Sequence, residues 1–149
     1  MTDDMTDGPV TLTFVVPFVA GQHRPRLSTR PFPHAVKADA DRSREAEVRA
    51  AFDAAMDEMG LAAPLAPKGV PVTLSIRTER PLPKSTPRRV GSAPDVCKPD
   101  ADNVAKLVMD ALNGRAYLDD SQVTCLHVTK RPRARGEAAT TVEVFVGGR

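Results

Sequence analysis

Hydrophobic and polar residues alternate in four segments of the chain and recur at helical spacing in two others. The alternating segments predict strands over residues 10–19, 70–78, 123–130 and 140–146. Pro17 places the first of these at a sheet edge or in a bend, because proline cannot donate to a strand ladder. Helical spacing predicts helices over residues 41–59, which Gly60 ends, and 101–112, which Asn113 and Gly114 end.

This order of elements predicts an α+β fold in which a small mixed or antiparallel four-stranded sheet packs with two main helices. With 149 residues, the chain has the length of one domain. We expect a disordered N-terminal tail over residues 1–8 and one domain over 9–149. Within it, residues 80–99 hold five prolines and five basic residues without hydrophobic periodicity, which predicts a mobile basic loop.

Composition narrows the cellular setting and the class of ligand. The two cysteines, Cys97 and Cys125, lack CxxC spacing, and no segment resembles a secretory signal or a membrane span. We therefore expect a cytoplasmic protein without a membrane partner. The chain has six aromatic residues and no tryptophan, so a stacking platform for single-stranded nucleic acid is poorly supported.

Basic residues gather in loops although the net charge is only +2. Three aspartates in the first seven residues mask a more basic body. Clustered cations are typical of proteins that bind a polyanion, although solvated loops would show the same pattern. The candidate DNA-binding residues are Arg24, Arg26, Lys84, Arg88, Arg89, Lys98, Arg131 and Arg133.

The candidate chemistry lies between Lys98 and Val123, where the sequence reads KPDADNVAKLVMDALNGRAYLDDSQV. Asp100 and Asp102 flank the start of the second predicted helix, where unpaired backbone N–H groups favour anions. Asp102 and Lys106 are four residues apart, so they share one side of that helix. Asp119 and Asp120 follow in a β-like segment, and we favour Asp120 as the one that faces the site.

Three carboxylates that converge repel one another unless a cation joins them. Oxygen ligands without cysteine or histidine select Mg²⁺, for which Mn²⁺ can substitute, and such an ion keeps waters available to attack a phosphate. The alternative interpretation is structural: Asp100 caps the helix, Asp102 pairs with Lys106, and the Asp119-Asp120 pair decorates a turn.

The runs KPDADN, KLVMDALNG and LDDSQV resemble, in order and spacing, the signature of RusA-type Holliday junction resolvases. About 26 residues carry the strong resemblance, and an Arg-Pro-Arg segment after the first strand agrees loosely. Many relatives have Lys-Gly just before Arg-Pro-Arg, whereas this chain has Gln22 and His23. That departure concerns how this loop binds DNA and leaves the carboxylate site untouched.

The resemblance implies a homodimer that resolves four-way junctions by hydrolysing two symmetrically placed phosphodiesters. It implies catalytic roles for Asp100, Asp102, Lys106 and Asp120. Of these, the three aspartates would bind the metal ion and Lys106 would neutralise charge on the phosphoryl oxygens. Asn103 and Asp119 would support the site. Two other functions stay open from the residues themselves: a non-catalytic module that binds branched DNA, and a metal-dependent phosphohydrolase that acts on a small phosphate ester.

Overall fold

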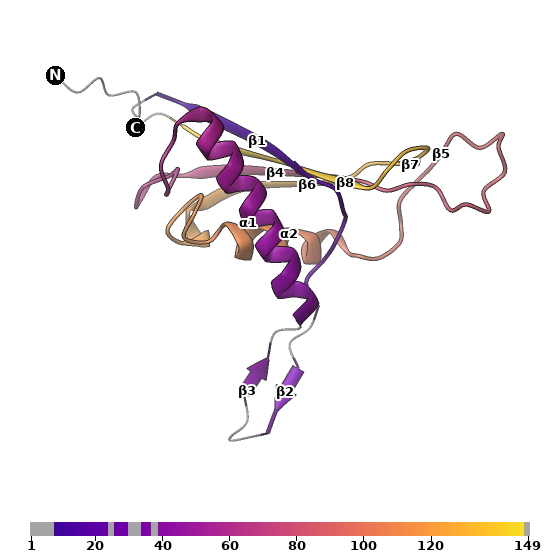
Figure 1. The fold of residues 1–149 in the computed structure, drawn as a ribbon, viewed down its shortest axis with the longest axis horizontal. Helices are drawn as coiled ribbons and strands as arrows, with labels where there is room; N and C mark the ends of the chain where they lie inside the picture. The colour runs from indigo at the N-terminus through magenta and orange to yellow at the C-terminus, as the bar shows by residue number, and fades with distance from the viewer. Residues whose placement is uncertain (1–7, 24–25, 30–33, 37–38, 148–149) are drawn as a thin grey trace.

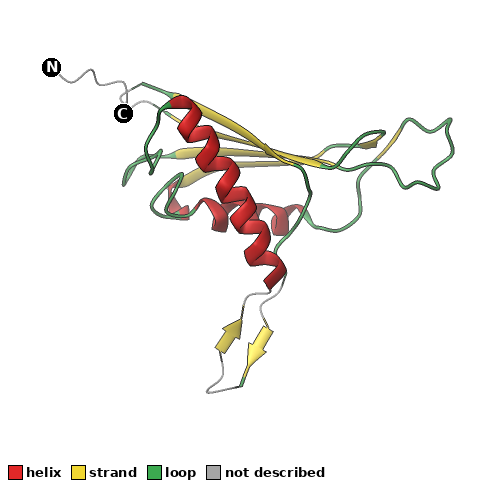
Figure 2. Cartoon of the chain, in the orientation of Figure 1, coloured by secondary structure: helices red, strands yellow, loops and turns green. Residues whose placement is uncertain are grey.

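The computed structural model describes residues 8–23, 26–29, 34–36 and 39–147, and both long helices lie on one face of its main sheet (Figures 1 and 2). The elements follow one another as β1 (Val10–Val16), β2 (Arg26–Ser28), β3 (His34–Val36), α1 (Asp39–Met59), β4 (Val72–Glu79), β5 (Ser92–Ala93), α2 (Ala101–Leu112), η1 (Asp120–Gln122), β6 (Val123–Lys130), β7 (Arg133–Ala134) and β8 (Ala139–Val146). No helix in the described ranges is long and apolar enough to cross a membrane.

The main sheet is mixed, as predicted. Its strand order is β1-β8-β4-β6, in which β8 is antiparallel to both of its neighbours and β6 is parallel to β4. The parallel pair arises because α2 lies between β4 and β6 along the chain and returns the backbone to the same end of the sheet. Strand β1 lies at an edge, as Pro17 predicted.

The core lies between one face of the sheet and the two helices. Leu12, Phe14 and Val16 are buried on β1, while the residues between them are exposed, so the period of two separates the two faces. Phe52 of α1 is fully buried and meets the Phe14 ring edge-on at 5.9 Å between ring centroids. The opposite face of the sheet is open, with Phe145 39% exposed.

Helix α2 is held by its buried apolar face and by a hydrogen bond near its C-terminal end. Val104, Val108 and Leu112 are buried, with Leu112 fully excluded from solvent. The buried Tyr117 hydroxyl donates to the Met109 carbonyl at 2.8 Å and satisfies one of the last acceptors of the helix. Gly60, at φ 66°, ends α1 in the left-handed conformation that its sequence position predicted.

Two small ladders were missed from the sequence. Strands β2 and β3 pair with each other between β1 and α1, and β5 pairs with β7. Each is two or three residues long, which is too short for alternation to reveal. The predicted tail over residues 1–8 falls almost entirely outside the described residues.

Side chains from outside the segment over residues 80–99 contact it, and its mobility stays a prediction. Arg135 donates to the carbonyls of Thr86, Pro87 and Val90 at 2.9 to 3.4 Å. Nearer the sheet, the buried Asp95 carboxylate lies 3.8 Å from Arg80 and 3.9 Å from Lys130. The loop extends beyond the end of the sheet in Figure 1, and its Lys84, Arg88 and Arg89 side chains are exposed.

Candidate active site at the start of helix α2

A cavity of about 770 Å³ opens at the N-terminal end of α2. One wall is the segment that follows β1, and the other is the turn from Lys98 into the helix. The polar residues that line it are Gln22, His23, Lys98, Asp100, Asp102, Asn103 and Lys106. Four of the six residues expected in or beside the active site therefore share this cavity.

Asp100 and Asp102 are both exposed in the cavity, one residue before and one residue into the helix. Asp100 occupies the N-cap position with extended backbone, yet its side chain makes no capping hydrogen bond. Its carboxylate oxygens are therefore not used to cap α2, and the structural interpretation of Asp100 as a side-chain cap is wrong. Lys106 is exposed one turn farther along, as the spacing of four predicted.

The segment that follows β1 is attached to α2 by its backbone and by one side chain. The Gln22 amide donates to the Asn103 carbonyl at 2.9 Å, and its side-chain nitrogen donates to Asp110 Oδ2 at 2.5 Å. Gly21 makes this approach possible, because a Cβ built there would lie 2.7 Å from Pro99 Cβ and 3.0 Å from Asn103 Cβ. The cavity wall is thus formed by a backbone contact that tolerates no side chain.

His23 lies on the same wall and is held by a carboxylate from α1. Asp41 accepts from the His23 backbone N–H at 2.9 Å and faces His23 Nδ1 at 2.7 Å. The Asp41 side chain is 3% exposed, whereas the His23 side chain is 70% exposed. The ring is therefore anchored at one nitrogen, while most of its surface stays exposed.

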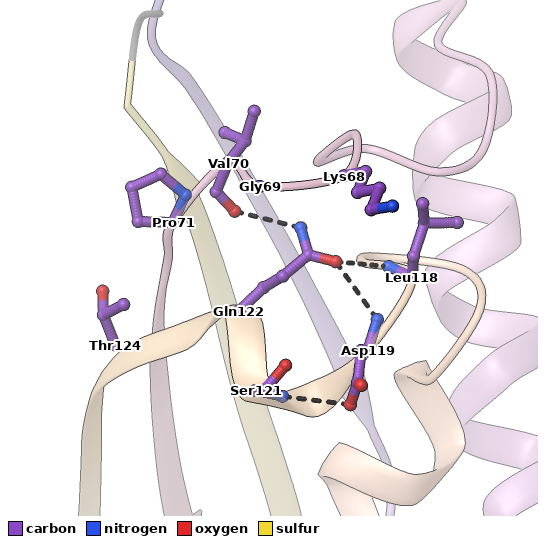
Figure 3. A pocket seen from close by; sticks show the side chains of 9 residues that line it. All are labelled: Lys68, Gly69, Val70, Pro71, Leu118, Asp119, Ser121, Gln122 and Thr124. Atoms are coloured by element: carbon purple, nitrogen blue, oxygen red, sulfur yellow. Dashed lines mark hydrogen bonds between the residues drawn. The ribbon is translucent and has the colours of Figure 1, made fainter.

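Asp119 and Asp120 come from the turn that precedes β6. Asp119 is extended and caps η1, with its side chain accepting from the Ser121 amide at 3.2 Å (Figure 3). Gln122 accepts from the amides of Leu118 and Asp119 and donates to the Val70 carbonyl at 3.0 Å, which fixes the turn to the segment before β4. The β-like segment expected for the pair is wrong for Asp120, which begins the 3₁₀ turn.

Asp119 and Asp120 have pKa values that shift in opposite directions. The backbone N–H of Ser121 lowers the pKa of Asp119, whereas a hydrogen bond to Asp119, some burial and the negative charges of Asp119 and Asp110 raise the pKa of Asp120. Burial, together with the charges of Asp120 and Asp110, also raises the pKa of Tyr117. The negative charge of Asp110 thus acts on both Asp120 and Tyr117.

The expected convergence of three carboxylates is not found in the described part of the chain. No group of three or more His, Cys, Asp or Glu side chains there could hold a metal ion. Asp100 and Asp102 line the cavity, but Asp120 does not, and Asp119 lines a different cavity of about 560 Å³ beside Val70 and Pro71 (Figure 3). Asp100 and Asp102 lie at the start of α2 and Asp110 lies farther along it, with Lys106 between them, whereas Asp119 and Asp120 belong to the turn before β6.

Asp110 was missed from the sequence, although a signal was available. It follows Lys106 by four residues and Asp102 by eight, so all three lie on one stripe of α2. The helix packs its apolar face on the core, which leaves this stripe to face the Gln22 loop. The contact with Gln22 joins positions 88 residues apart, and only the folded chain reveals it.

The candidate DNA-binding residues divide into exposed and anchored ones. Lys84, Arg88 and Arg89 are exposed on the extended loop, Arg131 is exposed after β6, and Lys98 lines the cavity. Arg133 is only partly exposed, and its Nε donates to the Pro81 carbonyl at 2.9 Å, so part of its side chain has a structural task. Arg24 and the side chain of Arg26 lie outside the described residues.

The fold and the site define this protein as a small α+β domain that has two carboxylates and a lysine in a cavity at the N-terminal end of a helix. Comparison with known proteins shows which family this domain belongs to. The family model of endodeoxyribonuclease RusA matches residues 17–145, and the chain belongs to that family. A curated relative, the uncharacterized protein YqaN of Bacillus subtilis (strain 168), is 41% identical over 68 residues, which cover 40% of this chain and 48% of the relative. The chain thus spans about half the length of that relative.

Proposed function

We propose that this protein is a divalent-metal-dependent endodeoxyribonuclease that cuts branched DNA, above all four-way junctions. The observation that carries the proposal is the cavity in which Asp100, Asp102 and Lys106 meet at the N-terminal end of α2. Carboxylates and a lysine exposed in one cavity are the groups that phosphodiester hydrolysis needs. Membership of the RusA family supports the same activity.

The residues of the cavity fit a hard divalent cation. Asp100 and Asp102 offer carboxylate oxygens, Asn103 offers an amide oxygen, and no capping bond uses the Asp100 side chain. Mg²⁺ is commonly held by one or two carboxylates and keeps several waters. When bound, such an ion supplies an activated water and charge stabilisation at the phosphate. We propose Asp100 and Asp102 as its ligands, with Mn²⁺ as a substitute ion. Asp120 does not line this cavity, and we propose it as the third carboxylate because the resemblance to RusA-type resolvases implies that role.

The other side chains bind and orient the substrate. Lys106, one turn from Asp102, places a cation where charge grows on the phosphoryl oxygens. Asn103 is fixed through its own carbonyl by the Gln22 amide, so it supports the start of the helix. Lys98 at the cavity, with Lys84, Arg88 and Arg89 on the extended loop, contacts phosphates of the junction arms.

A four-way junction has two equivalent strands to cut, so we propose that a two-fold symmetric homodimer cleaves them as a pair. A non-catalytic binding module is less well supported, because exposed carboxylates in the cavity would repel phosphates without serving any reaction. A phosphohydrolase of small esters is less well supported by the extended loop, whose exposed cations lie beyond the end of the sheet (Figure 1).

The proposal is tested by incubating the protein with a synthetic four-way junction, a fork and a linear duplex in EDTA, Mg²⁺, Mn²⁺ or Ca²⁺. We expect paired nicks in the junction with Mg²⁺ or Mn²⁺, binding without cutting in EDTA, and little cutting in Ca²⁺, whose longer bonds position water poorly. Full cutting in EDTA would refute the metal dependence. Equal cutting of linear duplex would refute the preference for branched DNA.

Three variants test the roles proposed for Asp102, Asp120 and Lys106. Asp102→Asn and Asp120→Asn should each abolish cutting, keep junction binding and weaken Mn²⁺ binding measured by calorimetry. Lys106→Ala should lose about 10²–10³-fold in single-turnover rate while it keeps Mn²⁺ affinity, because it removes only transition-state stabilisation. Asp57→Asn, an exposed carboxylate near the far end of α1, is the matched control. An Asp120→Asn variant with parental Mn²⁺ affinity would remove Asp120 from the ligand set.

A further inference from the structure

We infer that His23 is a catalytic residue that accepts the proton of the attacking water, and that Asp41 is the positioning residue that holds it for this task. The inference rests on the proposed nuclease activity. His23 lines the cavity that also contains Asp100, Asp102 and Lys106, and its side chain is 70% exposed. A histidine is the side chain most often used for proton transfer near neutral pH.

The contact with Asp41 fixes which ring nitrogen is available. Asp41 Oδ1 lies 2.7 Å from His23 Nδ1, and an ionised carboxylate can only accept a hydrogen bond. Asp41 lies in the first turn of α1, where the helix dipole favours the ionised form. Nδ1 therefore carries the hydrogen, which leaves the Nε2 lone pair as the acceptor at the open edge of the ring.

The Asp41 carboxylate fixes the orientation of the His23 side chain, although that side chain is exposed. Asp41 binds the backbone N–H of His23 with its second oxygen at 2.9 Å, so one buried carboxylate fixes both the backbone and the ring. The exposed fractions, 3% for Asp41 and 70% for His23, show a buried anchor under an accessible ring. A histidine that served only the fold would not need an exposed ring at the wall of a polar cavity.

The step balances without any further reactant than solvent water. The oxygen of water forms a bond to phosphorus while the bond from phosphorus to the leaving sugar oxygen breaks, and its electron pair stays on that oxygen. His23 Nε2 takes the proton released by the water and later returns it to solvent. The leaving oxygen takes a proton from solvent, so no net charge is created.

The test compares His23→Ala, Asp41→Asn and the control His127→Ala, an exposed histidine on β6, by single-turnover cleavage of a saturating four-way junction. Loss of a general base typically costs 10²–10⁴-fold, and we expect about that loss for His23→Ala with junction affinity kept. Added imidazole should restore part of the rate in His23→Ala. In Asp41→Asn the amide would donate to Nδ1 and reverse the tautomer, so a similar loss is expected.

A second measurement is independent of nuclease activity. Nitrogen-15 NMR of the metal-free protein should show the neutral His23 ring protonated at Nδ1, and Asp41→Asn should move the hydrogen to Nε2. A parental ring protonated at Nε2 overturns the inference even if the protein cuts junctions. So does a His23→Ala variant that cuts at the parental rate, or one that loses only affinity, while Asp102→Asn is inactive. A parental protein that cuts no DNA overturns the proposed function and, with it, this role.

Discussion

Replacing Gly21 by alanine tests whether the loop after β1 must lie against α2 for the site to work. The new Cβ would be 2.7 Å from Pro99 Cβ and 3.0 Å from Asn103 Cβ, where carbon atoms normally stay about 3.5–4.0 Å apart. Both neighbouring atoms are Cβ atoms, which are bonded directly to the backbone at the start of α2, so a change of rotamer cannot move them away. The loop must therefore move away from α2 by about 0.8 Å, which is the difference between a normal carbon–carbon contact of about 3.5 Å and the 2.7 Å separation from Pro99 Cβ.

A retreat of that size breaks the contact that fixes the cavity wall. The bond from the Gln22 amide to the Asn103 carbonyl, now 2.9 Å, would lengthen to about 3.7 Å, beyond hydrogen-bonding distance. Overpacking of this kind costs about 1–3 kcal/mol of stability. Displacing catalytic groups by about 1 Å can cost about 10²-fold in rate, and we expect Gly21→Ala to approach that loss.

Single-turnover cleavage of a four-way junction measures the rate, and thermal unfolding measures the stability. Gly91→Ala is the matched control, because a Cβ at Gly91 meets nothing within 4 Å. We expect the control to cut at the parental rate. A Gly21→Ala protein with parental rate and parental melting temperature would show that the loop can separate from α2 without consequence, and the reasoning would be wrong.

Three further outcomes are expected. The double variant Arg88→Ala/Arg89→Ala should weaken junction binding and flatten its salt dependence by about one unit for each lost phosphate contact. An unchanged slope would show that neither arginine contacts a phosphate. Asp119→Asn should lower the pKa of Asp120 toward its ordinary value in a metal-free NMR titration, because it removes the neighbouring charge and hydrogen bond that raise it; an unchanged pKa would assign the shift to burial. Tyr117→Phe should leave the Met109 carbonyl unpaired and cost about 1–2 kcal/mol in chemical unfolding with cutting intact, and unchanged stability would contradict the helix-end role of this hydroxyl.

The sequence by itself determined the main elements and the four site residues that α2 and its start carry. Helix α2 was predicted to begin at Ala101 and end at Leu112, as it does, because its apolar stripe and its stop at Asn113 and Gly114 are local signals. The position of Asp100, Asp102 and Lys106 followed directly, since residues one turn apart on one helix share a side whatever the rest of the chain does.

Only the tertiary structure decided the contacts that join distant segments. Asp120 could be placed after α2 but not relative to it, because the path of the turn depends on Gln122 and its bonds to the segment before β4. The pairing of Gln22 with Asp110 and that of His23 with Asp41 join residues far apart in the sequence, and no local periodicity encodes them. They exist because the sheet and both helices bury one common core, which brings the loop after β1 against the starts of α1 and α2.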